Sequence, residues 1–445
     1  MAQGLGSRPM ETSRQERAGE ELPPFAGAET SRRVAVVGAG LVGLSAAIWL
    51  QRAGHAVTLF DRAAPESGEA YRRAASFGNA CTFATGACLP VAMPGILRAV
   101  PGMLADPDGP LALCWADLPT LAPWLVAFLR SSTRREVDRI VAELGRLIRA
   151  AGPAQESLLE EAGATHLARR HGCLYLYKSE AAFAAAQRDI ELRAREGVAM
   201  SILSRDDIRD REPHLAPLYH KGLLFEDAWH FDTPYDYVLA LAGLFRRRGG
   251  TLRTAEIVEL RPDETGIRLA GDPDDEVFDR AVIAAGAWSR RLARSVGDRV
   301  LLDTERGYHV LFPGSQGLLG APTCYPEHGF YMTPTGEGLR AAGTVELGGL
   351  DRPARARRTD VIERVTRQLL PGVGNPGRRW LGFRPSAPDS LPFIGPSPTD
   401  RRIVHAYGHG HIGLTLAAIT GRLVAELVSD QTPALDLSAL APGRF

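Results

Sequence analysis

The sequence predicts an α/β protein of two domains, one assembled from the two ends of the chain and the other inserted from its middle. Three observations lead to this prediction. A strand, a glycine turn, a helix and a second strand follow one another in residues 34–61. A similar strand, glycine turn and helix occupy residues 403–429. Between them, residues 300–348 carry short extended segments typical of β-strands.

Residues 34–61 contain a glycine pattern suited to a dinucleotide. Gly38 permits a tight turn, Gly40 lets backbone N–H groups approach a pyrophosphate, and Gly43 lets the helix pack close to the strand. The phosphates would then lie at the positive end of the helix. Asp61 ends the second strand 18 residues after Gly43, where a carboxylate can accept hydrogen bonds from a ribose. The complete unit indicates a bound adenine dinucleotide.

The composition is that of an ordinary globular protein. The chain has 445 residues, of which 45% are hydrophobic and 23% charged, enough for two or three domains. Lys plus Arg and Asp plus Glu both number 52, and this neutral balance argues against nucleic acid as a partner. Five cysteines without a C-x-x-C pair indicate isolated thiols and no metal site. We therefore expect a cytoplasmic protein.

The N-terminal residues 1–31 are polar and lack an apolar block, so we expect a disordered leader. Arg32 and Arg33 precede an uncharged run, as they would in an export signal or before a membrane helix. The run 34–50 would span only about 25 Å as a helix, short of the ~30 Å hydrocarbon core. No membrane span is predicted.

The middle of the chain alternates helical and extended patterns. The acidic, Pro/Gly-rich residues 106–109 mark a crossing between domains. Residues 111–129 are aromatic-rich but interrupted by prolines, and form either a surface for a membrane or partner, or a buried helix-loop-helix. Residues 134–164 predict one or two amphipathic helices, and residues 233–248 a further helix with a capping threonine and a first-turn proline.

The glycine turn alone does not distinguish NAD from FAD, but two later segments favour FAD. Residues 280–288 predict a buried strand that ends in small side chains, so its backbone can pack against a cofactor. Residues 407–413 open the last helix, whose N–H groups and dipole suit the flavin N1 and C2 oxygen, where negative charge develops on reduction. A nicotinamide needs no such partner. A polar loop from Asp61 to about Arg73 and small residues 74–80 complete the expected cofactor side.

These segments resemble the D-amino acid oxidase and glycine oxidase superfamily of flavoproteins, closest to bacterial FAD-dependent D-amino acid dehydrogenases, with D-hydroxyproline as one candidate substrate. The motifs that carry the resemblance are GAGLVGLSAA, SFGNA, AVIAAGAWS, ERGYHV, GFRPSAPDSLPFIG and GHGHIGLT, spread over residues 34–430. The resemblance implies a Rossmann-like FAD-binding domain and a substrate domain built on a largely antiparallel β-sheet. The expected FAD-binding segments are 32–105, 226–299 and 376–445, and the substrate segments are 106–225 and 300–375.

The resemblance also implies the substrate-binding residues. Arg384 stands in the G-x-R-P motif, whose arginine pairs with the substrate carboxylate, and a guanidinium can donate two parallel hydrogen bonds to that group. Tyr331 is similar to a tyrosine whose hydroxyl meets the same carboxylate. Tyr308 and His309 belong to a strand beside the flavin, and alternation sends them to opposite faces. We expect Tyr308 in the pocket and His309 in a structural role. Asp389 either holds Arg384 or shapes its turn.

The expected cofactor contacts come from six segments of the chain. They are Gly38, Gly40, Leu41, Val42, Gly43, Asp61, Arg62, Ser76, Asn79, Val258, Ala285, Gly286, Trp288, Gly408, His409, Gly410, His411, Ile412 and Gly413. No metal is expected, and the two histidines would pack against or orient the flavin. The related sarcosine oxidases attach flavin through a cysteine near residues 382–390, and none stands there, so we expect non-covalent FAD.

The predicted reaction is oxidation of the Cα–N bond of a small amino acid, by hydride transfer to flavin N5, to an imine and then a 2-oxo acid. The electron acceptor would be oxygen, a quinone or a protein carrier, and peripheral contact with the inner membrane is conceivable. The alternatives are a flavin dehydrogenase for sarcosine, an L-amino acid or a 2-hydroxy acid, a catalytically silent FAD-binding subunit, and an NAD-linked reductase.

Overall fold

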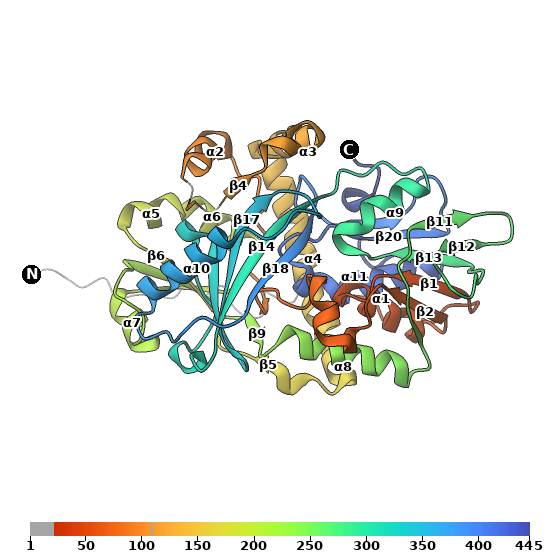
Figure 1. Cartoon of the computed structure of the whole chain (residues 1–445), viewed down its shortest axis with the longest axis horizontal. Helices are drawn as coiled ribbons and strands as arrows, with labels where there is room; N and C mark the ends of the chain where they lie inside the picture. The colour runs from red at the N-terminus through yellow and green to blue at the C-terminus, as the bar shows by residue number, and fades with distance from the viewer. Residues whose placement is uncertain (1–21, 107, 110) are drawn as a thin grey trace, which may run out of the picture.

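The computed structural model describes residues 22–106, 108–109 and 111–445 of the chain. Two sheets lie side by side, a six-stranded sheet on the right of Figure 1 and a nine-stranded sheet on the left. Each is built from segments far apart in the sequence, as predicted for an α/β protein with an inserted domain.

The six-stranded sheet is parallel except at one edge. Its strands, in spatial order, are β10 (Thr251–Thr254), β2 (Ala56–Asp61), β1 (Arg33–Val37), β13 (Arg280–Ile283), β20 (Ile403–Tyr407) and β19 (Phe393–Pro396). Val34 pairs with Val57 on one side and Arg280 on the other, and β19 runs antiparallel to β20. The central strands are buried on both faces, which explains their continuous runs of apolar residues.

Four helices cover one face of this sheet. They are α1 (Leu41–Arg52), α4 (Arg134–Ala162), α8 (Pro234–Arg247) and α11 (Gly413–Val428). α1 packs against α11 and α8, and α11 also packs against α4. The large hydrophobic core lies here, and a second core on the opposite face includes α9 (Ser289–Ser295). The first and last helical segments of the chain are therefore direct neighbours.

The nine-stranded sheet is mainly antiparallel. Its order is β18 (Arg379–Ser386), β14 (Asp303–Phe312), β17 (Gly338–Leu347), β16 (Phe330–Thr335), β15 (Thr323–Tyr325), β6 (Cys173–Tyr177), β8 (Lys221–Phe225) and β7 (Met200–Leu203), with β4 (Leu111–Leu113) beside β17. Among the described strands of this nine-stranded sheet, only the pairs β15–β6 and β17–β4 run parallel. Helix α10 (Ala356–Leu369) packs on β14 and β17.

The remaining elements connect or flank the two sheets. They are η1 (Pro65–Arg73), β3 (Thr82–Phe83), α2 (Ile96–Ala105), η2 (Trp115–Asp117), α3 (Leu118–Ser131), η3 (Thr165–Leu167), β5 (Ala168–Arg169), α5 (Glu180–Ala185), α6 (Gln187–Arg195), α7 (Arg205–Arg211), β9 (Trp229–Phe231), β11 (Glu259–Pro262), β12 (Ile267–Ala270), η4 (Gly286–Trp288), η5 (Gln316–Leu318), η6 (Pro326–His328) and η7 (Ser438–Leu440).

Several predicted elements are confirmed and others need correction. Residues 134–162 form one helix rather than two. The loop expected from Asp61 to Arg73 contains the 3-10 helix η1. Residues 118–131 form a single helix, because Pro119 occupies the first turn and only Pro123 lies in the interior. This helix is neither wholly buried nor wholly exposed. Trp124 is buried, but Val126 is 48% exposed and Trp115, just before the helix, 67% exposed.

The N-terminal prediction is tested only in part. Residues 1–21 of the expected leader lie outside the described residues. Residues 22–31 differ from a disordered segment, since Phe25 packs edge-on against Trp49 at 4.8 Å and Ala28 N donates to Ala53 O at 2.8 Å. The exact domain boundaries stay a prediction. No helix in the described part of the chain is long and apolar enough to cross a membrane.

Candidate active site

A cavity of about 590 Å³ lies between the two sheets. Its walls come from the β1–α1 turn, the segment 73–84, the β13–η4 turn, strands β14, β17 and β18, and the start of α11. The carboxyl ends of β1, β13 and β20 all point toward it, which is where ligands bind in open α/β sheets. Most of the predicted site residues line this one cavity, and the volume suits a large ligand.

The glycines of the first turn allow a backbone arrangement that side chains would obstruct. Gly38 has a φ of +113°, and a Cβ there would lie 2.3 Å from Ala284 O. A Cβ on Gly43 would lie 1.8 Å from Gly38 O, so this glycine brings α1 against the turn without lining the cavity. Gly38, Gly40, Leu41 and Val42 do line it. Close helix–strand approach is what the glycine spacing predicts.

Two helices begin at this cavity without a side-chain cap. Neither Gly40, before α1, nor Ile412, before α11, offers a capping side chain, and the first turns contain no acidic residue. The positive helix ends are therefore available to negatively charged groups of a ligand. Two uncapped N-termini in the wall of one cavity fit a ligand that carries both phosphates and an electron-rich ring.

Asp61 and Arg62 close the cavity at the end of β2. Asp61 accepts hydrogen bonds from Ala39 N at 2.7 Å and Ala63 N at 3.1 Å, and its burial raises the pKa of the carboxyl. The guanidinium of Arg62 lies 3.8 Å from the centre of the Trp288 ring. All three residues line the cavity, as predicted.

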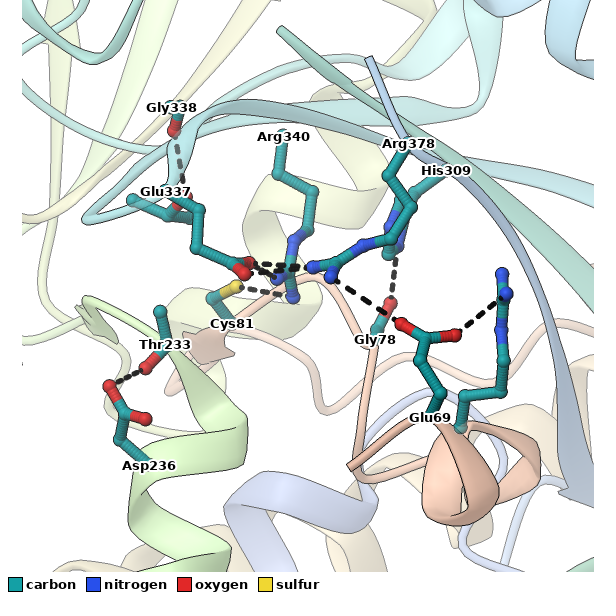
Figure 2. A network of polar contacts seen from close by, with 12 residues as sticks. Glu69, Gly78, Cys81, Thr233, Asp236, His309, Glu337, Gly338, Arg340 and Arg378 are labelled. Atoms are coloured by element: carbon teal, nitrogen blue, oxygen red, sulfur yellow. Dashed lines mark hydrogen bonds and ion pairs between the residues drawn. The ribbon is translucent and has the colours of Figure 1, made fainter. Parts of the chain in front are cut away.

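The segment 78–81 is held against the other sheet by polar contacts (Figure 2). Arg340 of β17 donates from Nη1 to Asn79 O at 3.0 Å and to Cys81 Sγ at 3.3 Å, and its Nη2 pairs with Glu337 at 3.0 Å. The ring Nδ1 of His309 is 2.9 Å from Gly78 O. The cavity wall formed by Gly78, Asn79 and Cys81 is thus fixed by strands of the nine-stranded sheet.

Arg384 provides a cation at the other end of the cavity. It lies on β18 opposite Glu305, and its Nη1 donates to Thr344 O at 3.0 Å. Among the described residues, no carboxylate oxygen lies within 4.0 Å of this guanidinium. Burial lowers its pKa, and the nearby Glu305 opposes that shift. A guanidinium has five N–H donors, so Arg384 retains donors for an anion.

Glu305 and His411 form a polar pair beside Arg384. His411 Nε2 is 2.6 Å from Glu305 Oε2, and both residues line the cavity. Burial opposes ionisation of Glu305, but His411 and Arg384 hold the pKa of its carboxyl below the ordinary value. The carboxylate of Glu305 is therefore hydrogen-bonded to the His411 ring and lies near the Arg384 guanidinium.

The aromatic residues of the site have different roles. Tyr331 lines the cavity, and its hydroxyl contacts that of Tyr175. Tyr308 also lines the cavity, but its hydroxyl donates to the buried Glu346 and accepts from Arg355 N at 3.2 Å, so its ring rather than its hydroxyl is offered to a ligand. His309 points away, stacked on Trp380 with ring centres 5.0 Å apart, in the structural role expected for it.

Some predicted residues lie near the cavity without lining it. Gly408, with a φ of +86°, allows the turn after β20, where a Cβ would lie 2.8 Å from the Phe393 ring. Val258 bonds through its N–H to Ala270 O at 3.0 Å, and its neighbour Ile257 lines the wall instead. Asp389 does not hold Arg384, because its carboxylate pairs with Arg444 at 2.8 and 2.9 Å and its Oδ1 accepts from Leu391 N.

The other predicted cofactor residues do line the cavity. They are Ser76, Asn79, Ala285, Gly286, Trp288, His409, Gly410, His411, Ile412 and Gly413. His409 is buried with its Nε2 2.9 Å from Thr420 Oγ1, and burial lowers its pKa to about 3. It therefore stays neutral, and its contact with Thr420 fixes the ring in the cavity wall. The described residues contain no cluster that could hold a metal ion.

Several lining residues were missed from the sequence, among them Glu305, Tyr175 and Arg193. Glu305 stands in the ERGYHV motif but has the strand parity of His309, so simple alternation would have placed it away from Tyr308; the register shift between Arg306 and Tyr308 allows both to line the cavity. Tyr175 and Arg193 lie in segments with no glycine or motif signal.

Comparison with known proteins gives concordant matches. The family model described as "DAO: FAD dependent oxidoreductase" matches residues 33–427. A D-amino-acid oxidase of Bradyrhizobium diazoefficiens is 39% identical over 430 residues, covering 93% of this chain and 99% of the relative. A D-amino acid dehydrogenase of Sinorhizobium medicae is 30% identical over 430 residues, covering 93% of this chain and 100% of the relative.

Solved structures share the fold. Glycine oxidase from Geobacillus kaustophilus superposes with a TM-score of 0.71 at 22% identity, covering 93% of this chain and 99% of that one. L-proline dehydrogenase from P. horikoshii gives a TM-score of 0.68 at 17% identity, covering 95% and 98%. These likenesses confirm the predicted combination of a Rossmann-like, mainly parallel sheet and a largely antiparallel second sheet.

Proposed function

Because the chain belongs to the DAO family of FAD-dependent oxidoreductases, we propose that this enzyme oxidises the Cα–N bond of a small D-amino acid. Its D-amino-acid oxidase and D-amino acid dehydrogenase relatives align over 93% of the chain, which supports this substrate class. D-Hydroxyproline is included, since a secondary amine has the same oxidisable bond.

The observation that carries the proposal is that Arg384 lines the same cavity as the glycine turn and has no carboxylate within 4.0 Å among the described residues. FAD fits the opposite end, where the uncapped α1 and the glycines 38 and 40 would hold the pyrophosphate and Asp61 the ribose. The N-terminus of α11 would face the flavin ring. A ligand carboxylate bound to Arg384 would then lie beside the ring.

The chain's own residues supply orientation and charge. Arg384 and the hydroxyl of Tyr331 would bind the substrate carboxylate and fix its Cα–H bond. The Glu305–His411 pair would face the substrate amine, while the walls from β14 and β17 exclude water. Bound FAD supplies the two-electron acceptor, whose N5 takes the Cα hydride. The imine product hydrolyses in water to a 2-oxo acid and ammonia.

We further propose that FAD is held without a covalent bond. The described segment 382–390 contains no cysteine, and Cys81, which lines the cavity, has a pKa raised by burial. A thiol kept protonated is a poor nucleophile for flavin attachment. Acid precipitation should therefore release all of the flavin into the supernatant. Oxygen, a quinone or a protein carrier would reoxidise it.

The test is anaerobic mixing of the flavin-loaded enzyme with a panel of D- and L-amino acids, sarcosine and 2-hydroxy acids, followed by absorbance of the bound flavin. We expect bleaching by D-amino acids or D-hydroxyproline and little by their enantiomers. If only sarcosine, an L-amino acid or a 2-hydroxy acid bleaches the flavin, the proposed D-amino acid substrate is wrong and that compound class takes its place. No bleaching by any compound would support a catalytically silent subunit. Readmission of oxygen or a quinone then identifies the acceptor.

A further inference from the structure

A second guanidinium lies in the same cavity. Arg193, on helix α6, lines it and is only 8% exposed. Its Nε donates to Gly86 O at 2.9 Å and its Nη1 to Asp189 O at 3.3 Å. Both acceptors are neutral backbone carbonyls, so these hydrogen bonds position the side chain but do not neutralise its charge.

No carboxylate lies within ion-pair distance of Arg193 in the described part of the chain, and that of Asp189 interacts with it only from farther away. Its neighbours on the same helix behave differently, since Arg188 and Arg195 both pair with Asp138, at 3.6 and 3.3 Å. The carboxylate of Asp189 lies beyond the 4.0 Å limit of an ion pair with Arg193. A buried charge without a partner is costly, because the protein does not replace the water that would solvate it.

Aromatic rings surround Arg193 without compensating this cost. Its guanidinium carbon lies 5.5 Å from the centre of the Phe225 ring and 5.9 Å from that of Tyr175. Contacts of this kind attract a cation but do not neutralise its charge. The hydroxyl of Tyr175 contacts that of Tyr331, so Arg193 lies one aromatic ring away from Tyr331.

We propose that Arg193 binds an anionic group on the substrate side chain, so that the preferred substrates are dicarboxylic amino acids. This inference rests on the proposed function, in which Arg384 and Tyr331 hold the α-carboxylate. A substrate with a second carboxylate would then bind Arg384 of β18 through its α-carboxylate and Arg193 of α6 through its side-chain carboxylate. The side-chain carboxylate would neutralise the buried charge that the described residues leave unbalanced.

The test compares D-glutamate with D-glutamine, which has nearly the same shape but no side-chain charge. In the wild-type holoenzyme, we expect kcat/KM for D-glutamate to exceed that for D-glutamine by about 10- to 100-fold. Arg193→Met should lower kcat/KM for D-glutamate and abolish this ratio, and Arg193→Lys should retain part of it. Arg188→Met, on the exposed side of the same helix, is the matched control and should leave the ratio unchanged.

A binding measurement gives a readout independent of turnover. Glutarate and butyrate, titrated against flavin absorbance, should differ in Kd in the wild type by a similar factor, and the difference should vanish in Arg193→Met. Equal kcat/KM values for D-glutamate and D-glutamine in the wild type would overturn the proposed subsite. This comparison does not depend on whether Arg193→Met folds. A preference that survives in Arg193→Met would also overturn the subsite. If no amino acid bleaches the flavin, the proposed function fails, whereas the glutarate titration still decides the subsite.

Discussion

Replacing Arg384 by leucine removes the cation proposed to hold the substrate carboxylate while keeping an apolar side chain on β18. Of the five N–H donors of the guanidinium, one is used by Thr344 O, which leaves enough for two parallel bonds to a carboxylate. Hydrogen bonds to charged groups contribute about 1.5–3 kcal/mol each. We therefore expect a loss of about 3–5 kcal/mol in kcat/KM, or roughly 150- to 5,000-fold.

The assay is the rate of anaerobic flavin reduction, measured against D-alanine concentration on protein with full flavin content. Arg379→Leu is the control, because Arg379 lies on the same strand but pairs with Asp360 and Glu363 outside the cavity. It should change kcat/KM by less than about threefold. Retention of wild-type kcat/KM by a folded, flavin-loaded Arg384→Leu protein would refute the assigned role.

A second variant displaces the guanidinium without removing it. The Cβ added by Gly307→Ala, on the facing strand β14, would lie 2.3 Å from Arg384 Cζ. Since a guanidinium is the flexible end of a long side chain, we expect it to move at little cost to folding. The Kd of a carboxylate inhibitor should rise at least about tenfold, as expected for a misplaced anchor. An unchanged Kd would show that the position of Arg384 does not matter for binding.

Three further predictions concern the cofactor turn, pH and the thiols. Gly43→Ala would place a Cβ 1.8 Å from Gly38 O, so we expect a destabilisation of about 1–3 kcal/mol and loss of flavin. Measurements of Tm and of flavin content check this, and an unchanged flavin content would contradict it. Burial lowers the pKa of His230 to about 4 and that of His409 to about 3, so each protonates more readily in the unfolded chain. Above about pH 6.5 both histidines are neutral in the folded and the unfolded chain, so they do not affect the free energy of unfolding. Below about pH 6.5 the unfolded chain binds the protons first, and each histidine lowers the free energy of unfolding by about 1.4 kcal/mol for every pH unit. Urea unfolding between pH 7 and 5 should therefore be less pH-dependent for His230→Gln than for the wild type, and identical slopes would refute the assignment. All five cysteines are buried, so a thiol reagent should label none rapidly in the native protein and five after denaturation; one fast native thiol would disagree with the structure.

The parts of the fold that could be predicted depend on local sequence. The turn at Gly38 and the helix after Gly413 were identified correctly because glycine positions and apolar periodicity act over a few residues. The alternation along β14 likewise separated Tyr308 from His309. A pattern within one element also predicts which of its faces is buried.

The missing parts of the site depend on contacts between distant segments. Arg193 lies in a short polar helix whose pattern does not differ from that of a solvated surface, and only the fold brings it to the cavity. Asp389 stands five residues from Arg384, yet its partner is Arg444, near the C-terminus. Proximity in sequence was therefore a poor guide to ion pairing, because strand direction and turns decide which side chains meet.

The position of β20 and α11 has a consequence for synthesis of the protein. β20 is the last parallel strand of the six-stranded sheet and pairs with β13, from which it is separated by more than a hundred residues. α11 packs directly on α1, although most of the chain lies between them. A nascent chain still attached to the ribosome through residues 403–428 lacks both elements. We therefore expect prosthetic-group capture to follow release of the completed polypeptide, so that premature termination before residue 403 yields a colourless product.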